Sequence, residues 1–592
     1  MIAERNASRP RGREGSVMAT IVDAVTTPVG SPDWRQVWLD SYPCDMPTTV
    51  PYPQAPLTAL LETAARRFPD RPACTLYGKA VSFAQLGDQA RRLARALADL
   101  GARPGRHIGL LLPNIPEYLV ALQAVWLTGA TALQLSPLMV AEEIGHWIEA
   151  TGCHLLVTLD LLAPAAVGAL KRGPLEHVVL TSLARRMAMW RGMLYRIERL
   201  RRNGYLRLPS DAHRHRFDEL IAGEPMVKPI AVNPAEDVAV LAPTGGTTAS
   251  PKAVMLTHRN LLANAMQLRS LCPGDDGEGG ILGVLPFFHS YGLTVSLLTS
   301  WAKAATLYLH PRFEARQVLA LLEEQRPDIV PAVPAMLHAL NKVMRGRSHD
   351  LSFIEMALSG ASALEPEVRR EFESYGVVGL VEGYGLTEAS PVTHANRPGA
   401  SNRPGTIGQP LPDTEARLAD PETGAELRDG VGELAVRGPQ VMKGYFNNPW
   451  ATQSVLKEGW LYTGDMVRRD AEGYYTIVDR KRDIIKTSGF LVFPAEVEEV
   501  IRAFPGVGEA AVIGAPDAER GETVKALIVP QGDVKLDMGA LEAHCRLHLS
   551  KHKRPRQFDV VGELPKNFLG KVLRRKLREA VPPLPGLAPA AS

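Results

Sequence analysis

Apolar and polar positions alternate along the first half of the chain with two different periods. Short apolar runs with the length of buried strands lie at 107–113, 154–158, 177–181 and 237–244. Between them are stretches with the apolar spacing of a helix, such as 93–101 and 141–152. Because helical patterns that alternate with buried strands are typical of layered folds, this pattern predicts an α/β protein with a largely parallel sheet.

The pattern becomes β-rich over residues 405–464, where short apolar segments are separated by Gly and Pro turns. This favours a small antiparallel or barrel-like subdomain. The charged segment 479–483 follows, and a second α/β pattern then continues to about residue 579. We therefore predict a large N-terminal domain at 36–478, which includes the β-rich subdomain, and a small mobile α/β C-terminal domain at 480–580.

Both chain ends have the composition of disordered segments. Residues 1–35 are basic and contain no apolar run, so no secretory signal is predicted, and Met1 and Met18 are both candidate starts. Residues 581–592 are rich in proline and alanine, which predicts a disordered tail.

The uncharged stretch 118–140 is long enough to raise the question of a membrane span. It contains Gln123, Gln134 and Gly129, however, which favour a different interpretation. We predict a buried helix that ends at Gly129, followed by a strand at 132–136.

Composition limits the class of protein without defining its chemistry. The chain of 592 residues has a net charge of +3, which is too small to argue for a nucleic-acid partner. The cysteines form no CxxC pair, which indicates a reducing, cytoplasmic location and argues against a zinc site or a disulfide framework. They are Cys44, Cys74, Cys153, Cys272 and Cys545.

A loop rich in glycine and hydroxyl residues follows the last of the apolar runs. Residues 244–252 read TGGTTASPK, which offers backbone N–H groups, hydroxyls and one cation to a phosphate. The sequence has no Walker A pattern, since Gly570-Lys571 is followed by Val572. Taken alone, the loop fits either a phosphate site or a surface turn.

Further segments with chemical character follow this loop. They are LPFFHSYGL at 285–293, SGASAL at 359–364, EGYGLTEASP at 382–391, GWLYTGD at 459–465, VDRKRDIIKTSGF at 478–490 and PKNFLGKVLRRKLRE at 565–579. With this order and spacing, the chain from about Trp38 to Arg578 resembles the adenylate-forming superfamily of acyl-CoA synthetases, firefly luciferase and peptide-synthetase adenylation domains. The segments VWLDSYPCDMPTTV, MLTHRNLLAN and VDRKRDIIKTSGF are similar to those of bacterial long-chain fatty-acid–CoA ligases.

The resemblance implies a ligase that works in two steps. A fatty acid, expected to be long-chain, is first joined to the α-phosphorus of ATP, which gives acyl-AMP and pyrophosphate. The acyl group is then transferred to CoA. The first step brings oxyanions together, so it requires cations and hydrogen-bond donors. Mg²⁺ shared with the phosphates is the expected metal.

The resemblance also implies roles for individual residues. The catalytic positions are Lys571, Thr387, Glu388 and His289. Lys571 would bridge the carboxylate and the α-phosphate, to which Thr387 would also donate. Glu388 would bind Mg²⁺, and His289 would orient the acid rather than accept a proton. Asp479 would be the hinge about which the small domain turns between the steps.

ATP is expected to contact residues from several of these segments. They are Thr244, Gly245, Gly246, Thr247, Thr248, Lys252, Gly360, Ala361, Gly383, Tyr384, Asp465 and Arg480. The loop would hold the β- and γ-phosphates and Tyr384 would stack on adenine. Asp465 would accept both ribose hydroxyls, with Arg480 as a further donor. Taken singly, each side chain also has a structural interpretation, such as a core aromatic for Tyr384.

The phosphate loop departs from the superfamily pattern at two positions. Ala249 and Ala253 stand where glycine is usual. If Ala249 must adopt a left-handed backbone conformation, the strain amounts to about 1 kcal/mol. This puts the efficiency of the enzyme in question more than its activity.

Residues 183–208 combine apolar residues with many arginines. On a helix, one face would carry Met189, Trp190, Met193, Leu194, Ile197 and Leu200, and the other Arg185, Arg191, Arg196, Arg199 and Arg202. This predicts a basic amphipathic helix that contacts an anionic membrane, with the protein peripheral on its inner face. The alternative is a helix docked on the core of its own protein.

Several related activities stay open from the sequence. A ligase for dicarboxylates, medium-chain acids or aryl acids would share the same motifs, and a fatty-acyl-AMP ligase would load a carrier protein. About twenty residues follow Lys571, so free CoA is the expected acceptor. A luciferase-like oxygenase and a non-catalytic ATP-binding protein are further alternatives, and no oligomeric state can be predicted.

Overall fold

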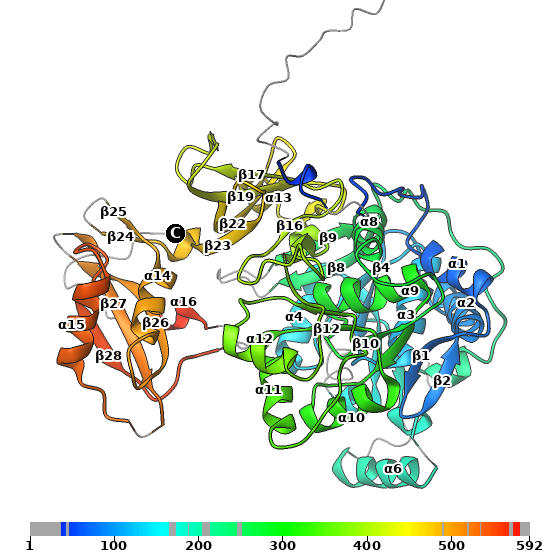
Figure 1. The fold of residues 1–592 in the computed structure, drawn as a ribbon. Coiled ribbons are helices and arrows are strands. Elements are labelled where there is room, and N and C mark those ends of the chain that lie inside the picture. Colours follow the sequence, from blue (N-terminus) through cyan, green and yellow to red (C-terminus); the bar gives the residue numbers. More distant parts are fainter. Residues whose placement is uncertain are drawn as a thin grey trace, which may run out of the picture.

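The computed structural model describes residues 37–42, 46–164, 173–187, 189–203, 213–244, 252–487, 490–517, 520–532, 534–566 and 572–580. The predicted leader 1–35 and tail 581–592 lie outside these residues. A large body of sheets and helices is flanked by a smaller unit, which is built from the chain after residue 480 (Figure 1).

One sheet of the large body contains all the strands that the apolar runs predict. In spatial order it consists of β20 (Gly444–Tyr445), β9 (Lys252–Thr257), β8 (Val238–Thr244), β4 (Thr131–Gln134), β3 (His107–Leu111), β5 (Cys153–Leu159), β6 (His177–Thr181) and β7 (Arg214–Arg216). The strands from β8 to β7 are parallel, whereas β9 and β20 pair antiparallel. The prediction of a largely parallel sheet is therefore confirmed.

A second sheet packs against the same core. In spatial order it consists of β16 (Gln409–Pro410), β15 (Val392–Ala395), β14 (Leu380–Gly385), β13 (Met356–Ser359), β12 (Ile329–Ala332), β10 (Gly280–Gly283), β11 (Thr306–Leu309), β1 (Pro72–Leu76) and β2 (Lys79–Ser82). The strands from β14 to β1 are parallel, and both edges are antiparallel. The parallel strands β13 and β14 thus end at the same edge of the sheet.

Helices cover and separate these two sheets. They are α1 (Ala59–Arg67), α2 (Phe83–Asp99), α3 (Pro116–Leu127), α4 (Ala141–Thr151), α7 (Phe217–Leu220), α8 (His258–Arg269), α9 (Thr299–Lys303), α10 (Ala315–Gln325), α11 (Pro334–Met344) and α12 (Pro366–Glu373). Polar side chains define where several of them begin. Ser82 and Gln85 form a capping box at the start of α2, as do Thr257 and Asn260 for α8, so backbone N–H groups of the first turn are satisfied.

Helix α3 is the apolar segment that raised the question of a membrane span. Every residue of α3 is buried, and the helix contacts β3 and β4 of one sheet and β1 of the other. It ends before Gly129, which has a left-handed backbone, and β4 follows. The predicted buried helix and strand are therefore confirmed. Among the described residues, no helix is both long and apolar enough to cross a membrane.

The β-rich region forms a separate antiparallel sheet. It consists of β18 (Glu426–Leu427), β17 (Glu415–Ala419), β19 (Val431–Arg437), β22 (Trp460–Arg469) and β21 (Leu456–Lys457), with β23 (Tyr475–Arg480) paired to β22. Helix α13 (Pro449–Val455) precedes β21. The sheet agrees with the predicted antiparallel subdomain but extends past residue 464, because β22 runs to Arg469 and pairs with β23.

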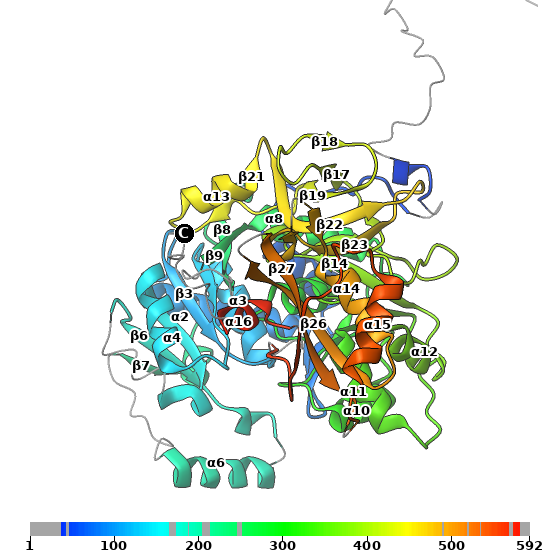
Figure 2. The same cartoon turned by 90° about the vertical axis from the view of Figure 1, so that its left-hand side faces the viewer.

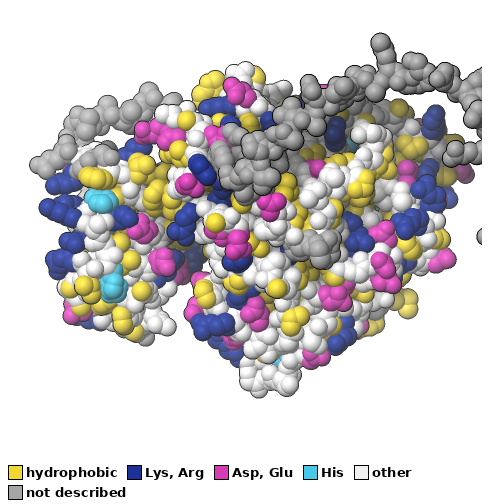
Figure 3. Space-filling model, turned by 45° about the horizontal axis from the view of Figure 1, so that its top comes forward, with side chains coloured by type: hydrophobic (Ala, Val, Ile, Leu, Met, Phe, Trp, Pro, Cys, Tyr) yellow, Lys and Arg dark blue, Asp and Glu magenta, His cyan; other side chains and the backbone are white. Residues whose placement is uncertain are grey.

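The C-terminal unit has its own sheet and its own core. Its strands are β25 (Phe490–Val492), β24 (Ile485–Thr487), β27 (Gly521–Pro530), β26 (Val507–Asp517) and β28 (Gln557–Val560), and its helices are α14 (Pro494–Arg502), α15 (Met538–His548) and α16 (Arg574–Glu579). Two apolar clusters fill this unit, and both are built only from residues between 485 and 577. A groove separates the C-terminal unit from the large body (Figure 3). Lys and Arg side chains gather on the outer face of the C-terminal unit. The fold class of a large α/β body with a smaller C-terminal unit is confirmed.

Helix α6 (Met189–Asn203) lies at the edge of the molecule, away from the two sheets (Figures 1 and 2). It is attached on one side, where Tyr195 donates its hydroxyl to Asp160 Oδ1 at 2.7 Å and Gly192 lies close to Ala184. The opposite side is solvent-exposed and apolar, with exposed fractions of 92% for Met189, 61% for Trp190, 64% for Met193, 57% for Leu194 and 37% for Ile197. A helix therefore forms over Met189–Asn203 of the predicted segment 183–208, with Arg185 in a separate 3₁₀ turn, and its apolar side chains are exposed.

Candidate functional site

A cavity of about 410 Å³ lies beyond the carboxyl ends of β13 and β14. Ligands of open α/β sheets bind at such edges. The cavity is lined by many of the residues that the motifs predict: Thr244, Lys252, His289, Gly360, Ala361, Gly383, Tyr384, Thr387, Glu388 and Arg480. Residues that are separated by more than two hundred positions in the sequence thus meet in one place.

Asp465 connects two of the lining residues at one end of the cavity. Strands β22 and β23 pair so that Asp465 lies opposite Arg480, whose Nε is 2.8 Å from Asp465 Oδ1. Tyr384 donates its hydroxyl to Asp465 Oδ2 at 2.5 Å. Burial, with the Asp465 carboxylate close by, raises the pKa of Tyr384 well above its ordinary value, so the phenol stays a donor. A carboxylate has about four acceptor positions, and Asp465 therefore keeps capacity for further donors.

Thr387 and Glu388 begin a short 3₁₀ turn, which Leu386 separates from the end of β14. The hydroxyl of Thr387 is 3.2 Å from that of Ser290, and Glu388 Oε1 accepts a hydrogen bond from Tyr445 at 2.8 Å. Lys252 Nζ lies 5.0 Å from the centre of the Tyr445 ring. One carboxylate, hydroxyl groups and an ammonium are thus gathered on this side of the cavity.

His289 enters the cavity from the loop after β10. The next residues begin a π-helical segment at Gly292–Leu298, a conformation that is frequent at functional sites. Gly292 is required there, because a Cβ would lie 2.3 Å from the Pro286 carbonyl oxygen. His289 Nδ1 accepts the N–H of Tyr291 at 3.3 Å, and burial lowers the pKa of His289 to about 4. The imidazole is therefore neutral near pH 7.

The ends of the predicted phosphate loop meet at the cavity. Thr244 and Lys252 are paired partners in β8 and β9, and the Thr244 hydroxyl donates to the Lys252 carbonyl at 3.2 Å. Ala253 lies within β9, where an extended backbone accepts alanine as readily as glycine. Ala253 therefore carries no left-handed strain, whereas the strain considered for Ala249 stays a prediction. Gly245, Gly246, Thr247, Thr248 and Ala249 lie outside the described residues, as does Lys571.

Comparison with known proteins identifies the family. A family model described as AMP-binding enzyme matches residues 61–446, and a model described as AMP-binding enzyme C-terminal domain matches residues 496–571. The chain belongs to the AMP-binding enzyme family. The resemblance to adenylate-forming enzymes is therefore confirmed.

The curated relatives of this AMP-binding enzyme cover nearly all of it. A long-chain-fatty-acid–CoA ligase of Bacillus subtilis strain 168 is 38% identical over 550 residues, which span 92% of this chain and 98% of that protein. The ligase of the same name from Salmonella typhimurium is 34% identical over the same shares of the two chains. A feruloyl-CoA synthase from Amycolatopsis sp is 33% identical and covers 87% of this chain and 96% of its own.

Solved structures with the same fold include an ATP-bound protein and a fatty acyl CoA synthetase. ATP-bound MatB from Rhodopseudomonas palustris is 27% identical, with a TM-score of 0.77 over 89% of this chain and 99% of its own. A Mycobacterium tuberculosis fatty acyl CoA synthetase is 25% identical, with a TM-score of 0.70 over 88% and 98%. The overall architecture of this AMP-binding enzyme is thus that of acyl-activating enzymes.

The cavity of the AMP-binding enzyme also contains residues that the motifs did not single out. Ser290, Tyr445 and Arg482 line it together with the predicted residues. Ser290 and Arg482 are neighbours of predicted residues, but Tyr445 reaches the cavity only because β20 pairs with β9. That pairing joins residues almost two hundred positions apart, so local sequence carried no signal for it.

Asp479, the predicted hinge, connects the antiparallel sheet to the C-terminal unit. It lies in β23, and its Oδ2 accepts the N–H of Ala495 in the first turn of α14 at 2.7 Å. Arg574 of α16 approaches Oδ1 at 3.9 Å, and burial raises the pKa of the Asp479 carboxyl. Motion of the C-terminal unit about this residue remains a prediction.

Proposed function

We propose that this AMP-binding enzyme is an ATP-dependent long-chain fatty-acid–CoA ligase. It would form a fatty acyl-AMP with release of pyrophosphate and then transfer the acyl group to CoA. The observation that carries the proposal is the cavity itself. Tyr384 and Arg480, which Asp465 holds, line it together with Thr387, Glu388 and Lys252. The names of the curated relatives support a long-chain acid as the substrate.

ATP would bind with its nucleoside toward Asp465 and its phosphates toward Lys252. Tyr384 is fixed through its hydroxyl, so its ring offers an apolar face to adenine, while Asp465 and Arg480 would bind the ribose. Lys252 and the loop that begins after Thr244 would hold the β- and γ-phosphates. The orientation follows from placing each polar group of ATP on a complementary group of the cavity.

The donor set at Glu388 fits a magnesium ion that is shared with the phosphates of ATP. Mg²⁺ is commonly bound through one or two carboxylates together with substrate phosphates and water. Glu388 supplies one carboxylate, and within the described residues no cluster of His, Cys, Asp and Glu would bind a metal by itself. When bound, the ion would neutralise charge on the phosphates as pyrophosphate leaves.

Two residues would act on the acid as it attacks the α-phosphorus. Lys571 would bridge the attacking carboxylate and the α-phosphate, where an ammonium stabilises the crowded negative charge of the transition state. His289 is neutral near pH 7, so it would orient the carboxylate by a hydrogen bond rather than by charge. Thr387 would donate its hydroxyl to the α-phosphate. The C-terminal unit would then turn about Asp479 to admit CoA.

We further propose that the enzyme contacts an anionic membrane on its cytoplasmic side through α6. The exposed apolar face carries Met189, Trp190 and Met193, and Trp side chains favour the membrane interface. Arg196 is exposed on the same helix, and the sequence of α6 adds further arginines. A water-insoluble acid that is dissolved in the bilayer would then reach the enzyme without passing through water.

The function can be tested by measuring pyrophosphate release with a panel of acids, each with and without CoA. The proposal expects activity with saturated long-chain acids and formation of their CoA thioesters. Preference for a dicarboxylate or an aryl acid would contradict the substrate assignment. Acyl-AMP formation without any thioester would indicate a carrier protein as the acceptor instead.

A further inference from the structure

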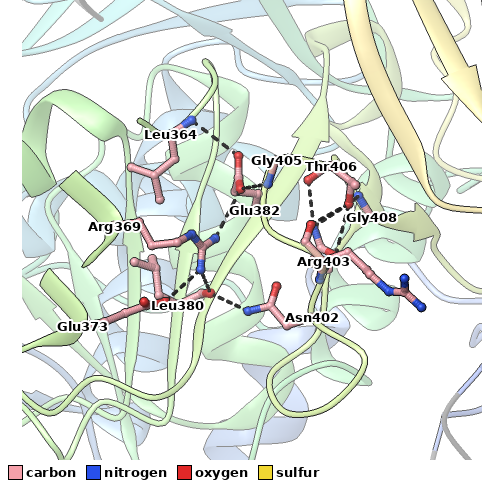
Figure 4. Close-up of polar contacts among 11 residues, drawn as sticks. Leu364, Arg369, Glu373, Leu380, Glu382, Asn402, Arg403, Gly405, Thr406 and Gly408 are labelled. Atoms are coloured by element: carbon pink, nitrogen blue, oxygen red, sulfur yellow. Dashed lines mark hydrogen bonds and ion pairs between the residues drawn. The ribbon is translucent and has the colours of Figure 1, made fainter. Parts of the chain in front are cut away.

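The carboxylate of Glu382 joins three segments next to the cavity (Figure 4). Glu382 lies in β14 and is 8% exposed. Its Oε1 accepts the N–H of Gly405 at 2.9 Å, and its Oε2 accepts the N–H of Leu364 at 3.4 Å. Arg369 Nη2 lies 3.2 Å from the same Oε1. One side chain thus connects β14 to the loop after β13 and to the loop before β16.

The side chain of Arg369 holds the backbone at the start of β14. It lies on α12, is 6% exposed and donates from Nη1 to the Leu380 carbonyl at 2.7 Å and to Glu373 at 2.9 Å. Asn402 donates to the Leu380 carbonyl as well, at 2.9 Å (Figure 4). A guanidinium that holds both a strand backbone and its side chain leaves that strand little freedom to move.

The segments that Arg369 and Glu382 connect also line the cavity. The loop that ends at Leu364 supplies Gly360 and Ala361, and β14 supplies Gly383 and Tyr384 just after Glu382. Ala361 has a left-handed backbone, with φ of 73°, a strained state that persists only where the surroundings enforce it. The hydrogen bond from Leu364 to Glu382 is one contact that fixes this loop.

Buried ion pairs are poor evidence for a role in stability alone. Desolvation offsets most of the attraction between the two charges, and apolar replacements of a whole pair are often tolerated. The hydrogen bonds, by contrast, define distances between backbone segments. The Arg369–Glu382 pair is therefore better suited to fixing geometry than to adding stability.

We propose that Arg369 and Glu382 are positioning residues for nucleotide binding. They fix the spacing between the loop 360–364 and β14, and the purine ring would lie in that space. The inference rests on the proposed function, which assigns ATP to this cavity. It concerns the affinity for the adenine nucleotide and not the binding of the acid or of CoA.

The test compares Arg369→Met, Arg369→Lys and Glu382→Gln with the parent enzyme. KM for ATP, KM for the acid and kcat are measured by pyrophosphate release, and AMP binding is measured by calorimetry. We expect Arg369→Met and Glu382→Gln to raise KM for ATP at least about tenfold and to weaken AMP binding in parallel. The change in kcat should stay below about threefold, KM for the acid should be unchanged, and Arg369→Lys should recover part of the affinity.

A matched control pair joins the end of α11 to α12, since Arg345 directly follows α11 and Glu371 lies on α12. Arg345 and Glu371 form a two-point ion pair at 2.6 and 2.8 Å, but the Arg345 side chain is largely exposed. Arg345→Met should therefore leave every constant unchanged. Asp465→Ala is a second reference, because its failure to weaken AMP binding would refute the nucleotide site itself.

Two results would overturn the inference while leaving the proposed function intact. One is unchanged AMP affinity in Arg369→Met and Glu382→Gln together with weak binding in Asp465→Ala. The other is an equal rise in KM for ATP and for the acid, which would mean a general structural role. If Arg369→Met does not fold, Arg369→Lys and Glu382→Gln decide between these outcomes.

Discussion

At the scale of single residues, the cavity is organised by side chains that hold one another. Tyr384 and Arg480 are both fixed by Asp465, and Glu388 is held by Tyr445. Such contacts orient groups before a ligand arrives, which is how electrostatic stabilisation of a transition state is achieved without reorganisation. Lys571 is the residue that would place a positive charge beside the reacting atoms of the first step.

Replacement of Lys571 by alanine should separate the two half-reactions. We expect a loss on the order of 10²–10³ in pyrophosphate release from ATP and acid, because the transition state would lose its bridging cation. Conversion of supplied acyl-AMP and CoA to thioester should continue, since the C-terminal unit would then have turned away. Lys566→Ala is the control, because Lys566 is paired with Glu509 on the surface of the same unit. Near-normal adenylation in Lys571→Ala would refute the assignment.

Much of the cavity could be predicted from motif order, and the part that could not has a physical reason. Thr387, Glu388, Asp465 and Arg480 lie in motifs whose residue types match the chemistry of ATP. Tyr445 was missed because its position depends on the β20–β9 pairing, which no local pattern encodes. The role that we propose for Arg369 was not predicted either, because an arginine on a short helix has no local signature.

At the scale of elements, periodicity predicted the strands of one sheet well because most of their apolar residues are buried. All residues of β5, for example, are buried, and a continuous apolar run is what such a strand requires. Helix α6 shows the opposite case, in which the periodicity is correct but the apolar face is exposed to solvent. Its exposure is the reason to expect a membrane there.

Charge and apolar contact should both contribute to membrane binding by α6. We expect the protein to sediment with anionic vesicles at low salt and to dissociate as salt rises, because attraction between arginines and lipid headgroups is screened. Replacing Arg196, Arg199 and Arg202 with glutamate should abolish binding and leave activity on soluble, shorter acids intact. In the control, glutamate replaces Arg95 and Arg370, two exposed arginines far from α6 in the sequence, and binding should persist. Vesicle binding that does not weaken as salt rises, or that persists in the triple variant, would contradict the proposal.

At the scale of the whole molecule, two cores are joined through one short connection. Asp479 anchors α14 of the C-terminal unit to β23 of the large body. Asp479→Pro fixes φ at this connection and should block rotation. We therefore expect acyl-AMP formation to continue and transfer to CoA to fail. Asp479→Ala removes the carboxylate but keeps the backbone free, so it should transfer better than the proline variant. Equal loss of both half-reactions in Asp479→Pro would mean that the residue is only structural.

The stability of the large body should fall in mild acid. Burial lowers the pKa of His258 and His289 to about 4 and that of His394 to about 3, whereas their ordinary value is 6.5. The unfolded chain therefore binds protons below about pH 6.5 that the folded protein does not bind, and stability decreases as the pH falls from there toward 4. Melting temperatures measured across this range should show the decrease.

A single variant can attribute part of this decrease to one imidazole. His258 Nδ1 accepts the N–H of Leu57 at 3.3 Å, a bond that a protonated ring cannot form. His258→Gln should keep an acceptor and flatten the dependence on pH, whereas replacement of the exposed His548 should not. A pH profile that is identical in all three proteins would exclude His258 as a contributor.

Isotope transfer can show whether the acid is activated as an acyl-adenylate. Hexadecanoic acid labelled with ¹⁸O in both carboxyl oxygens is converted with ATP and CoA, and the products are analysed by mass spectrometry. The acid attacks the α-phosphorus through one carboxyl oxygen, and that oxygen stays with AMP when CoA displaces it. We expect one ¹⁸O in AMP, one in the thioester carbonyl and none in pyrophosphate. Label in inorganic phosphate, with ADP as the nucleotide product, or AMP without label would contradict it.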